Sequence, residues 1–225
     1  MGSMVETQYK TVIFDLDGTL LDTLQDLCDA VNAALLRCGY PPRSLEEVRA
    51  FVGNGIKLLM VRALPGGEDN PDFPAAFQAF RESYTAHCFD HTRPYPGIDG
   101  LLAELKAAGC RIAVVSNKAD AAVKALCRQF FPDTVDIAVG EREAEGIRKK
   151  PAPDTVLEVL RLFDADRASA VYIGDSDVDI MTAGNAGLPC ISVTWGFRSK
   201  EFLAEHGAAR YADSPAELGA LLLRS

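Results

Sequence analysis

The chain has 225 residues, is 48% hydrophobic and carries a formal net charge of −9, which suits one large domain or a domain with an insertion. The acidic balance and the lack of a dense Lys/Arg cluster argue against a nucleic-acid partner. No apolar run approaches the roughly 20 residues that cross a bilayer. No signal peptide is visible, and six cysteines without a CxxC pair fit reduced thiols, so we expect a cytoplasmic protein with no membrane partner. Residues 1–3, "MGS", are interpreted as the remnant of an expression tag and set aside.

Short runs rich in Val and Ile predict buried strands. They lie at 11–16, 111–116, 135–139, 170–174 and 190–194. Amphipathic patterns separate the later ones, and these predict helices over 98–108, 119–130 and 154–163. Alternation of this kind predicts an α/β fold, a doubly wound, Rossmann-like parallel sheet.

One segment, residues 23–93, breaks the alternation and is predicted to be helical throughout. Its apolar side chains recur at helical spacing, and "SLEE" at 44–47 reads as a capping box. We therefore predict an α/β core from 4–22 and 94–225, with a helical cap from 23–93 inserted after strand 1. Because ligands of open α/β sheets bind at the carboxyl ends of the strands, the cap is expected to overhang the site.

Polar residues follow the predicted strands. They are Asp15, Asp17, Ser116, Asn117, Lys150, Asp175, Asp177 and Asp179. The stretch "IFDLDGTLLD" alone carries Asp15, Asp17 and Asp22, and carboxylates this close repel one another. A hard divalent cation such as Mg²⁺ takes oxygen ligands and neutralises that repulsion. The sequence therefore predicts a magnesium site in which a phosphoryl group and its lysine partner share the pocket.

The same residues predict a mechanism. Asp15, at the tip of strand 1, is placed to attack phosphorus and form an aspartyl-phosphate. Asp17, two residues on, could protonate the leaving oxygen and then activate water. Gly18 would let backbone N–H groups approach the phosphate, and Ser116 and Lys150 would stabilise the charge on the transferring group.

"DLDGT", the serine after strand 2, "KPAPD" and "GDSDVD" resemble, in order and spacing, the four motifs of haloacid dehalogenase-like hydrolases. The resemblance covers nearly the whole chain and implies a Mg²⁺-dependent phosphomonoesterase. It implies that Asp15 is nucleophile and metal ligand, that Asp17 ligates through its backbone carbonyl, and that Asp175 is a ligand. Asp179 would support the metal through its waters, and Thr19 follows Gly18 as in the family's phosphatases.

The stretches "VGNGIKLLMVRAL" and "YPGIDGLLAELKAAG" look most like the phosphoglycolate phosphatase branch. Such a substrate, a small phosphorylated metabolite, carries a second anion that the cap would have to bind. Lys57 and Arg62, on the helix after Gly53 and Gly55, are the candidates, and Asn117 is expected to reach the site from the sheet. The resemblance leaves open whether the protein is a monomer or a homodimer.

Other substrates and activities stay open at this point. Nucleoside monophosphates, pyrophosphate, sugar phosphates and pyridoxal phosphate are alternatives within the class, and a phosphomutase of the same fold or a non-catalytic binding protein lies outside it. A dehalogenase is disfavoured, because those relatives do not need Asp17 and the Mg²⁺ ligands.

Several residues near these motifs have simpler interpretations. Lys149 and Asp177 are expected at the solvent edge, and Lys118 is expected to be structural or solvent-facing. Cys88 in "HCFDHTR" is expected in a helical core, since the spacing to the arginine is too short for a cysteine phosphatase loop. The three histidines are too scattered for a histidine-based metal site.

Overall fold

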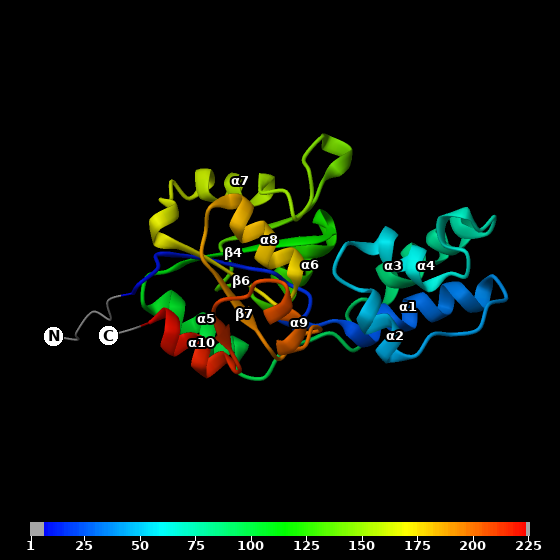
Figure 1. The fold of residues 1–225 in the computed structure, drawn as a ribbon, viewed down its shortest axis with the longest axis horizontal. Helices are drawn as coiled ribbons and strands as arrows, with labels where there is room; N and C mark the ends of the chain where they lie inside the picture. Colours follow the sequence, from blue (N-terminus) through cyan, green and yellow to red (C-terminus); the bar gives the residue numbers. More distant parts are fainter. Residues whose placement is uncertain (1–6, 224–225) are drawn as a thin grey trace. The chain divides into compact units, whose positions relative to one another are not determined.

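The computed structural model describes residues 7–223 (Figure 1). Contacts divide this part of the chain into two compact units, one made of 7–20 with 94–223 and the other of Leu21–Arg93. The predicted tag remnant, residues 1–3, lies outside the described residues. So do the first residues of the predicted core, 4–6, and its last two, 224–225.

The larger unit is built on a parallel sheet, in which six strands are found among the described residues. The strands are β1 (Thr11–Phe14), β4 (Arg111–Ala119), β5 (Ile137–Glu141), β6 (Ala170–Gly174), β7 (Cys190–Val193) and β8 (Tyr211–Ala212). Their order is β5-β4-β1-β6-β7-β8, and the paired neighbours run parallel. The predicted doubly wound α/β fold is therefore confirmed. β4 extends three residues beyond the predicted 111–116, and β5 begins two residues later than the predicted 135–139.

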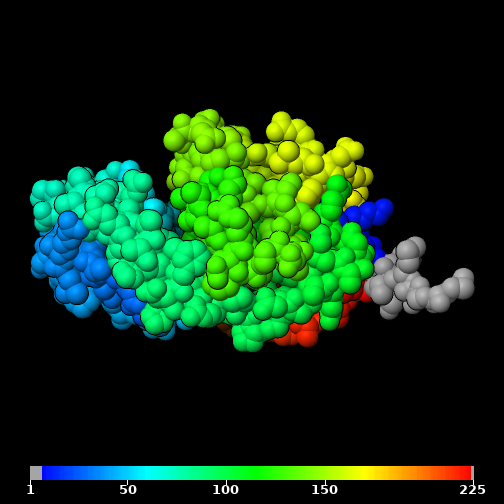
Figure 2. Space-filling view, turned by 180° about the vertical axis from the view of Figure 1, so that it is seen from behind, coloured from blue at the N-terminus to red at the C-terminus, as the bar shows by residue number. Residues whose placement is uncertain are grey.

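Helices cover both faces of this sheet. They are α5 (Ile98–Ala107), α6 (Asp120–Phe130), α7 (Asp154–Leu162), α8 (Asp177–Ala186), α9 (Lys200–Glu205) and α10 (Pro215–Leu222). On one face, Ile13 and Tyr172 of the sheet join a buried cluster with Val156 of α7 and Ala183 of α8. α5 and α10 lie on the opposite side of the sheet (Figure 1). Seen from behind, the surface of this unit is formed largely by segments between β3 and α7, green in Figure 2.

The smaller unit is helical, as its apolar spacing predicted. It contains α1 (Leu24–Arg37), α2 (Leu45–Phe51), α3 (Ile56–Ala63), a 3₁₀ turn (Gly67–Asp69) and α4 (Phe73–His87). The predicted capping box opens α2: Ser44 Oγ accepts from the Glu47 amide at 3.2 Å, and Glu47 Oε2 accepts from the Ser44 amide at 2.8 Å. α1 packs on α4, and both helices bury apolar side chains, Val31 and Phe80 among them. Cys88, directly after α4, is buried as predicted.

The two ends of the helical insertion are tied together. β2 (Leu21–Asp22) pairs with β3 (Arg93–Pro94) in a two-stranded sheet. Close to these strands in the chain, the buried Asp26 carboxylate accepts the backbone N–H groups of His91 and Thr92, each at 2.9 Å, and the Thr92 hydroxyl at 2.7 Å. Three donors on one buried carboxylate satisfy a charge that would otherwise be costly to bury. In the part of the chain that the structure describes, no helix is both long and apolar enough to cross a membrane.

Candidate active site

The sheet order brings three strand ends together. β1 lies between β4 and β6, with Phe14 in register with both Val114 and Ile173. The chain winds outward from β1 through β4 to β5, and then resumes at β6 on the other side. Ligands of doubly wound sheets bind at such a reversal point, outside the carboxyl ends of the strands. The residues that follow β1 and β6, and the last residues of β4, are therefore placed where a ligand of such a sheet binds.

A buried lysine joins two carboxylates at this edge. Lys150 Nζ lies 2.9 Å from Asp15 Oδ1 and 2.8 Å from Asp179 Oδ1. It also donates to the Tyr172 hydroxyl at 3.1 Å, and that hydroxyl lies 3.2 Å from Asp179 Oδ1 and 3.3 Å from the Val115 carbonyl. All four of these side chains are buried. Tyr172 was predicted only as part of a strand, because nothing in a strand pattern reveals what a hydroxyl contacts.

The electrostatics of this cluster follow from burial and from its surplus of carboxylates. Burial raises the pKa of Asp15 well above its usual range, and the neighbouring Asp179 carboxylate raises it further. The same two causes raise the pKa of Asp175 to about 7. Burial disfavours the Lys150 ammonium, but the Asp15 and Asp179 carboxylates outweigh that effect and hold the pKa of Lys150 well above its usual range. A further positive charge at this edge would relieve the repulsion.

A second lysine holds Asp17. Lys118 Nζ lies 2.7 Å from Asp17 Oδ1, and its side chain is only 4% exposed. The backbone N–H of Lys118 donates to Ser116 Oγ at 3.2 Å. Of the two alternatives expected for Lys118, structural or solvent-facing, the solvent-facing one is therefore wrong: β4 continues to Ala119 and includes Lys118, whose ammonium is buried on Asp17. The two-residue spacing from Ser116 was the available signal, and it was missed because the strand was predicted to end at 116.

Asp175 is fixed by groups from two other segments. Asp175 Oδ2 accepts the Phe197 backbone N–H at 2.6 Å, and Oδ1 accepts the Thr19 hydroxyl at 3.4 Å. Trp195 Nε1 donates to the Thr19 carbonyl at 3.0 Å. The loop after β7 thus belongs to the site, although its sequence gave no reason to include it, since its contact with Asp175 comes from a backbone amide.

Three glycines leave room for the carboxylates. A Cβ on Gly18, whose φ is +82°, would lie 2.4 Å from Asp175 Oδ2. A Cβ on Gly196 would lie 2.4 Å from the same oxygen, and one on Gly174 would lie 2.3 Å from Asp179 Cβ. Gly18 therefore serves both the turn after β1 and the position of Asp175.

The donor set suits a hard divalent cation. Asp15, Asp175 and Asp179 each offer a carboxylate oxygen within 4.8 Å of the others. Asp179 is already well satisfied: its Oδ2 accepts the Ser176 amide at 3.1 Å and the Ser176 hydroxyl at 2.6 Å, while Oδ1 accepts from Lys150 and Tyr172. Asp15 and Asp175, with raised pKa values, have more to gain from a cation.

Ser116 and Asn117 lie at the same edge, and both are buried. Asn117 Nδ2 donates to the Lys150 carbonyl at 3.0 Å, while its Oδ1 is buried without a hydrogen-bond partner among residues 7–223. Asn117 thus ties β4 to the segment that carries Lys150.

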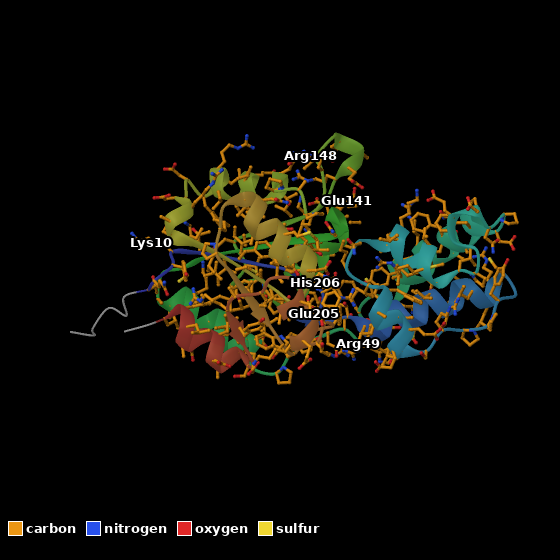
Figure 3. The ribbon with its side chains drawn as sticks, in the orientation of Figure 1. Lys10, Arg49, Glu141, Arg148, Glu205 and His206 are labelled. Atoms are coloured by element: carbon orange, nitrogen blue, oxygen red, sulfur yellow. The ribbon has the colours of Figure 1, made fainter. Side chains whose placement is uncertain are left out.

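Other residues named from the sequence lie elsewhere. Asp22 is exposed and accepts the Leu24 backbone N–H at 3.3 Å, and Lys149 pairs with Glu143 at 2.9 Å. Asp177 is the first residue of α8. Next to Lys149, Arg148 pairs with Asp154 at 2.7 Å and lies on the surface beside α7 (Figure 3).

The cap candidates are engaged within the helical unit. Lys57 Nζ pairs with Glu68 at 2.6 Å, and both side chains are 59% exposed. Arg62 Nη1 donates to the Phe51 carbonyl at 2.7 Å. Neither contact prevents its side chain from binding a ligand. The exposed Lys57 ion pair is weak and exchanges partners readily, and the Arg62 guanidinium has further N–H donors.

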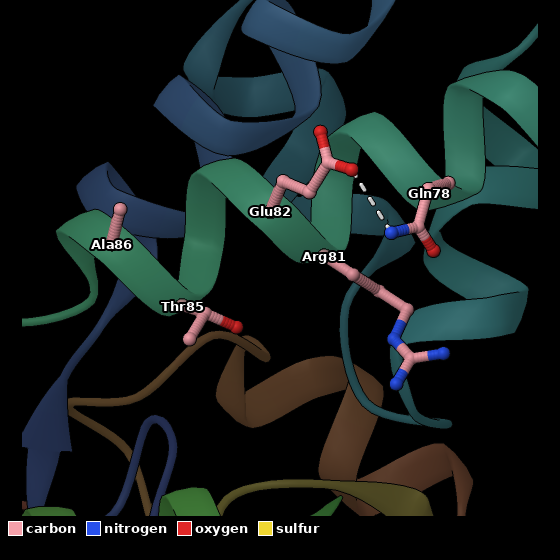
Figure 4. Close-up of a pocket in the computed structure, with 5 residues that line it drawn as sticks. All are labelled: Gln78, Arg81, Glu82, Thr85 and Ala86. Carbon is pink, nitrogen blue, oxygen red and sulfur yellow. Dashed lines mark hydrogen bonds between the residues drawn. The ribbon is translucent and has the colours of Figure 1, made fainter.

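A shallow hollow of this unit lies along α4, where Gln78 donates to Glu82 at 3.0 Å (Figure 4). Its lining residues are Gln78, Arg81, Glu82, Thr85 and Ala86. They come from one helix and include none of the predicted site residues.

Comparison of the sequence with models of known protein families identifies the family of this chain. The model of the haloacid dehalogenase-like hydrolases matches residues 12–193. The chain belongs to this family. The matched range runs from β1 to the end of β7 and so contains every residue that was predicted for the site of this hydrolase.

Curated relatives extend over most of this hydrolase. A phosphoglycolate phosphatase of Pseudomonas putida is 35% identical over 92% of the chain and 74% of its own length. One from Rhodobacter capsulatus is 36% identical over 90% of the chain and 92% of its own length.

Solved structures agree with the fold of this hydrolase. A candidate phosphoglycolate phosphatase from Lactobacillus delbrueckii subsp. bulgaricus has a TM-score of 0.91 and 36% identity, covering 97% of this chain and all of its own. CbbY from Rhodobacter sphaeroides, solved with phosphate, has a TM-score of 0.74 and 32% identity, covering 94% of this chain and 96% of its own.

Proposed function

We propose that this hydrolase is a Mg²⁺-dependent phosphatase that cleaves phosphomonoesters through an aspartyl-phosphate on Asp15. The observation that carries the proposal is the buried Asp15 carboxylate, which lies just after strand β1, within the sheet, and 2.9 Å from Lys150 Nζ. The family to which the chain belongs is one of hydrolases. Curated relatives that carry the name phosphoglycolate phosphatase support the same reaction class.

In the first step, an Asp15 oxygen attacks phosphorus and the bond from phosphorus to the ester oxygen breaks. Asp17 donates a proton to that oxygen, which leaves as an alcohol. Lys150 and the Ser116 hydroxyl bind the oxygens of the transferring group, and backbone N–H groups around Gly18 assist. In the second step, water attacks the phosphorus of the aspartyl-phosphate, Asp17 accepts a proton from it, and inorganic phosphate leaves as Asp15 is restored.

Mg²⁺ would be held by the Asp15 and Asp175 carboxylates and by the Asp17 backbone carbonyl, with Asp179 supporting the metal shell through bound waters. When bound, the cation neutralises part of the negative charge that the carboxylates and the phosphate bring together. The fit of these residues rests on their oxygen donors and on the raised pKa values of Asp15 and Asp175.

The preferred substrate we propose is phosphoglycolate, with residues 23–93 acting as the cap over a core formed by 4–22 and 94–225. The names of several curated relatives support this choice. In this proposal Asn117, Gly18 and Thr19 contact the phosphate end, and Lys57 or Arg62 binds the distal carboxylate. We assign the enzyme to the cytoplasm, because its cysteines are free thiols, as a reducing compartment favours.

The test is steady-state phosphate release with Mg²⁺ over a panel of phosphomonoesters. The panel contains phosphoglycolate, nucleoside monophosphates, sugar phosphates and pyridoxal phosphate, with pyrophosphate added. We expect the highest kcat/KM for phosphoglycolate. A higher value for another compound would reassign the substrate, whereas isomerisation of a sugar phosphate without phosphate release would indicate a phosphomutase. No turnover of any of them would refute the phosphatase assignment.

A further inference from the structure

We propose that Lys118 is a positioning residue for Asp17, holding its carboxyl group where, in the protonated form, it can pass a proton to the leaving oxygen. The inference rests on the proposed function and adds to it a residue outside the four motifs. It starts from the short contact between Lys118 Nζ and Asp17 Oδ1, which are 2.7 Å apart.

This contact differs from the surface ion pairs of the chain. The side chains of Lys118 and Asp17 are 4% and 14% exposed, whereas those of the Lys57–Glu68 pair are each 59% exposed. Separating a buried pair leaves an uncompensated charge away from water, so a buried pair is held together more firmly than an exposed one. Asp17 therefore has a defined orientation relative to the end of β4.

The backbone around Lys118 makes the same connection. The pairing of β4 with β5 shifts register between Val115 and Ala119, so the strand is irregular where it carries Ser116 and Lys118. The Lys118 N–H donates to Ser116 Oγ at 3.2 Å, while its ammonium reaches Asp17. One residue thus links a phosphate-binding hydroxyl to the general acid.

The two buried lysines divide the carboxylates between them. Lys150 contacts Asp15 and Asp179, and Lys118 contacts Asp17. Lys150 therefore lies beside the nucleophile, whereas Lys118 lies beside the group that handles the proton. Losing Lys118 should impair proton transfer more than phosphate binding.

Leaving-group dependence separates these two effects. An alkyl phosphate needs protonation of its leaving oxygen, whereas p-nitrophenyl phosphate expels a stable phenolate without it. Since general acid catalysis contributes about 10²- to 10⁴-fold, we expect Lys118→Met to lower kcat/KM by about 10²-fold or more for an alkyl phosphate. For p-nitrophenyl phosphate the loss should stay below about tenfold. Lys118→Arg, which keeps the charge, should restore part of the alkyl phosphate activity.

The matched control is Lys106→Met, which removes another short Lys–Asp contact, to Asp136 at 2.6 Å, outside the proposed site. Lys106→Met should leave kcat/KM unchanged for both substrates. Circular dichroism and thermal melting establish that each variant is folded, and if Lys118→Met does not fold, the same comparison is made with Lys118→Gln and Lys118→Arg.

Equal losses on both substrates would overturn the inference, because they would assign Lys118 to phosphate binding or to structure alone. Failure of Lys118→Gln as well as Lys118→Met to fold would also overturn it in favour of a structural role. A wild-type protein inactive on both substrates would instead refute the proposed function, and the inference with it.

Discussion

The Asp15 carboxylate and the Lys150 ammonium lie 2.9 Å apart, and both are buried at the carboxyl end of the central sheet. If Asp15 is the nucleophile, Asp15→Asn should fold normally but lose at least about four orders of magnitude in kcat, as removal of a covalent nucleophile does. Phosphate release and thermal melting measure both halves of this expectation. A variant that kept a tenth of the wild-type activity would exclude a covalent step at Asp15.

Metal removal is the second test. EDTA should abolish activity and Mg²⁺ should restore it, since Asp15, Asp175 and the phosphate all require a compensating cation. Asp175→Ala should sharply raise the Mg²⁺ concentration at half-maximal rate, and Ca²⁺, which is larger and less strict in geometry, should inhibit. Full activity in the chelator would contradict the assignment.

The stability of the metal-free protein should depend on pH in a defined direction. Burial raises the pKa of Asp175 to about 7, from a usual value of 3.8, and raises that of Asp15 as well. The folded state then holds these protons more tightly than the unfolded chain, so the free energy of unfolding should fall as the pH rises from about 4 to about 7.

Mg²⁺ should reverse this loss, because it takes the place of the protons. Its stabilising effect on Tm should therefore be larger at about pH 7.5 than at about pH 5.5, where the carboxyl groups are still partly protonated. Thermal melts of EDTA-treated protein with and without Mg²⁺ measure the difference. An equal shift at both pH values would mean that the cation does not bind at these carboxylates.

Gly18 can be tested against a glycine with nearly the same φ angle. Gly18 and Gly109 have φ values of +82° and +83°, but a Cβ on Gly109 would meet no atom of the described residues within 4 Å, whereas one on Gly18 would meet Asp175. Both alanine variants should lose about 1–2 kcal/mol for the left-handed conformation. Only Gly18→Ala should also raise the Mg²⁺ requirement and slow turnover, by about 10²-fold if Asp175 moves by an ångström.

The proposed roles of Lys57 and Arg62 can be tested by comparing two substrates, one with a second anion and one without it. Lys57→Met or Arg62→Met should cost about 1.5–3 kcal/mol in kcat/KM for phosphoglycolate, the value of a hydrogen bond to a charged group. Ethyl phosphate, which lacks the second anion, should be unaffected. Arg37→Met is the control, because it removes an exposed cation of the same unit, paired with Glu82 at 2.8 Å. Equal effects on both substrates would show that neither Lys57 nor Arg62 binds the second anion of phosphoglycolate.

The sequence predicted the sheet and the helical insertion well, because their patterns are local: buried runs of Val and Ile, helical spacing and the capping box at Ser44. It also placed Asp15, Ser116, Lys150 and Asp175 at one edge, since the carboxyl ends of parallel strands meet there. β8 was missed, because two residues carry no periodicity.

Contacts between residues that lie far apart in the sequence could not be predicted from such local patterns. Asp22 looked like part of the acidic cluster by spacing, yet it is exposed and accepts the Leu24 N–H. Lys118 was expected to be structural or solvent-facing, and nothing in its local pattern indicated that its ammonium is buried against Asp17. Phe197 acts through a backbone amide, which every residue type except proline supplies, so its side chain gave no signal.

The closed base of the helical insertion has a consequence for how such proteins diversify. Its first and last residues are paired in β2 and β3, and Asp26 fastens the start of α1 to the backbone just before β3. A segment whose two ends already meet can be exchanged for another of different length without stretching the strands on either side. The helical insertion can therefore be moved between proteins as one piece. A chimera joined at Leu21 and Arg93 would keep the strand pairing and the Asp26 hydrogen bonds that hold the two ends together.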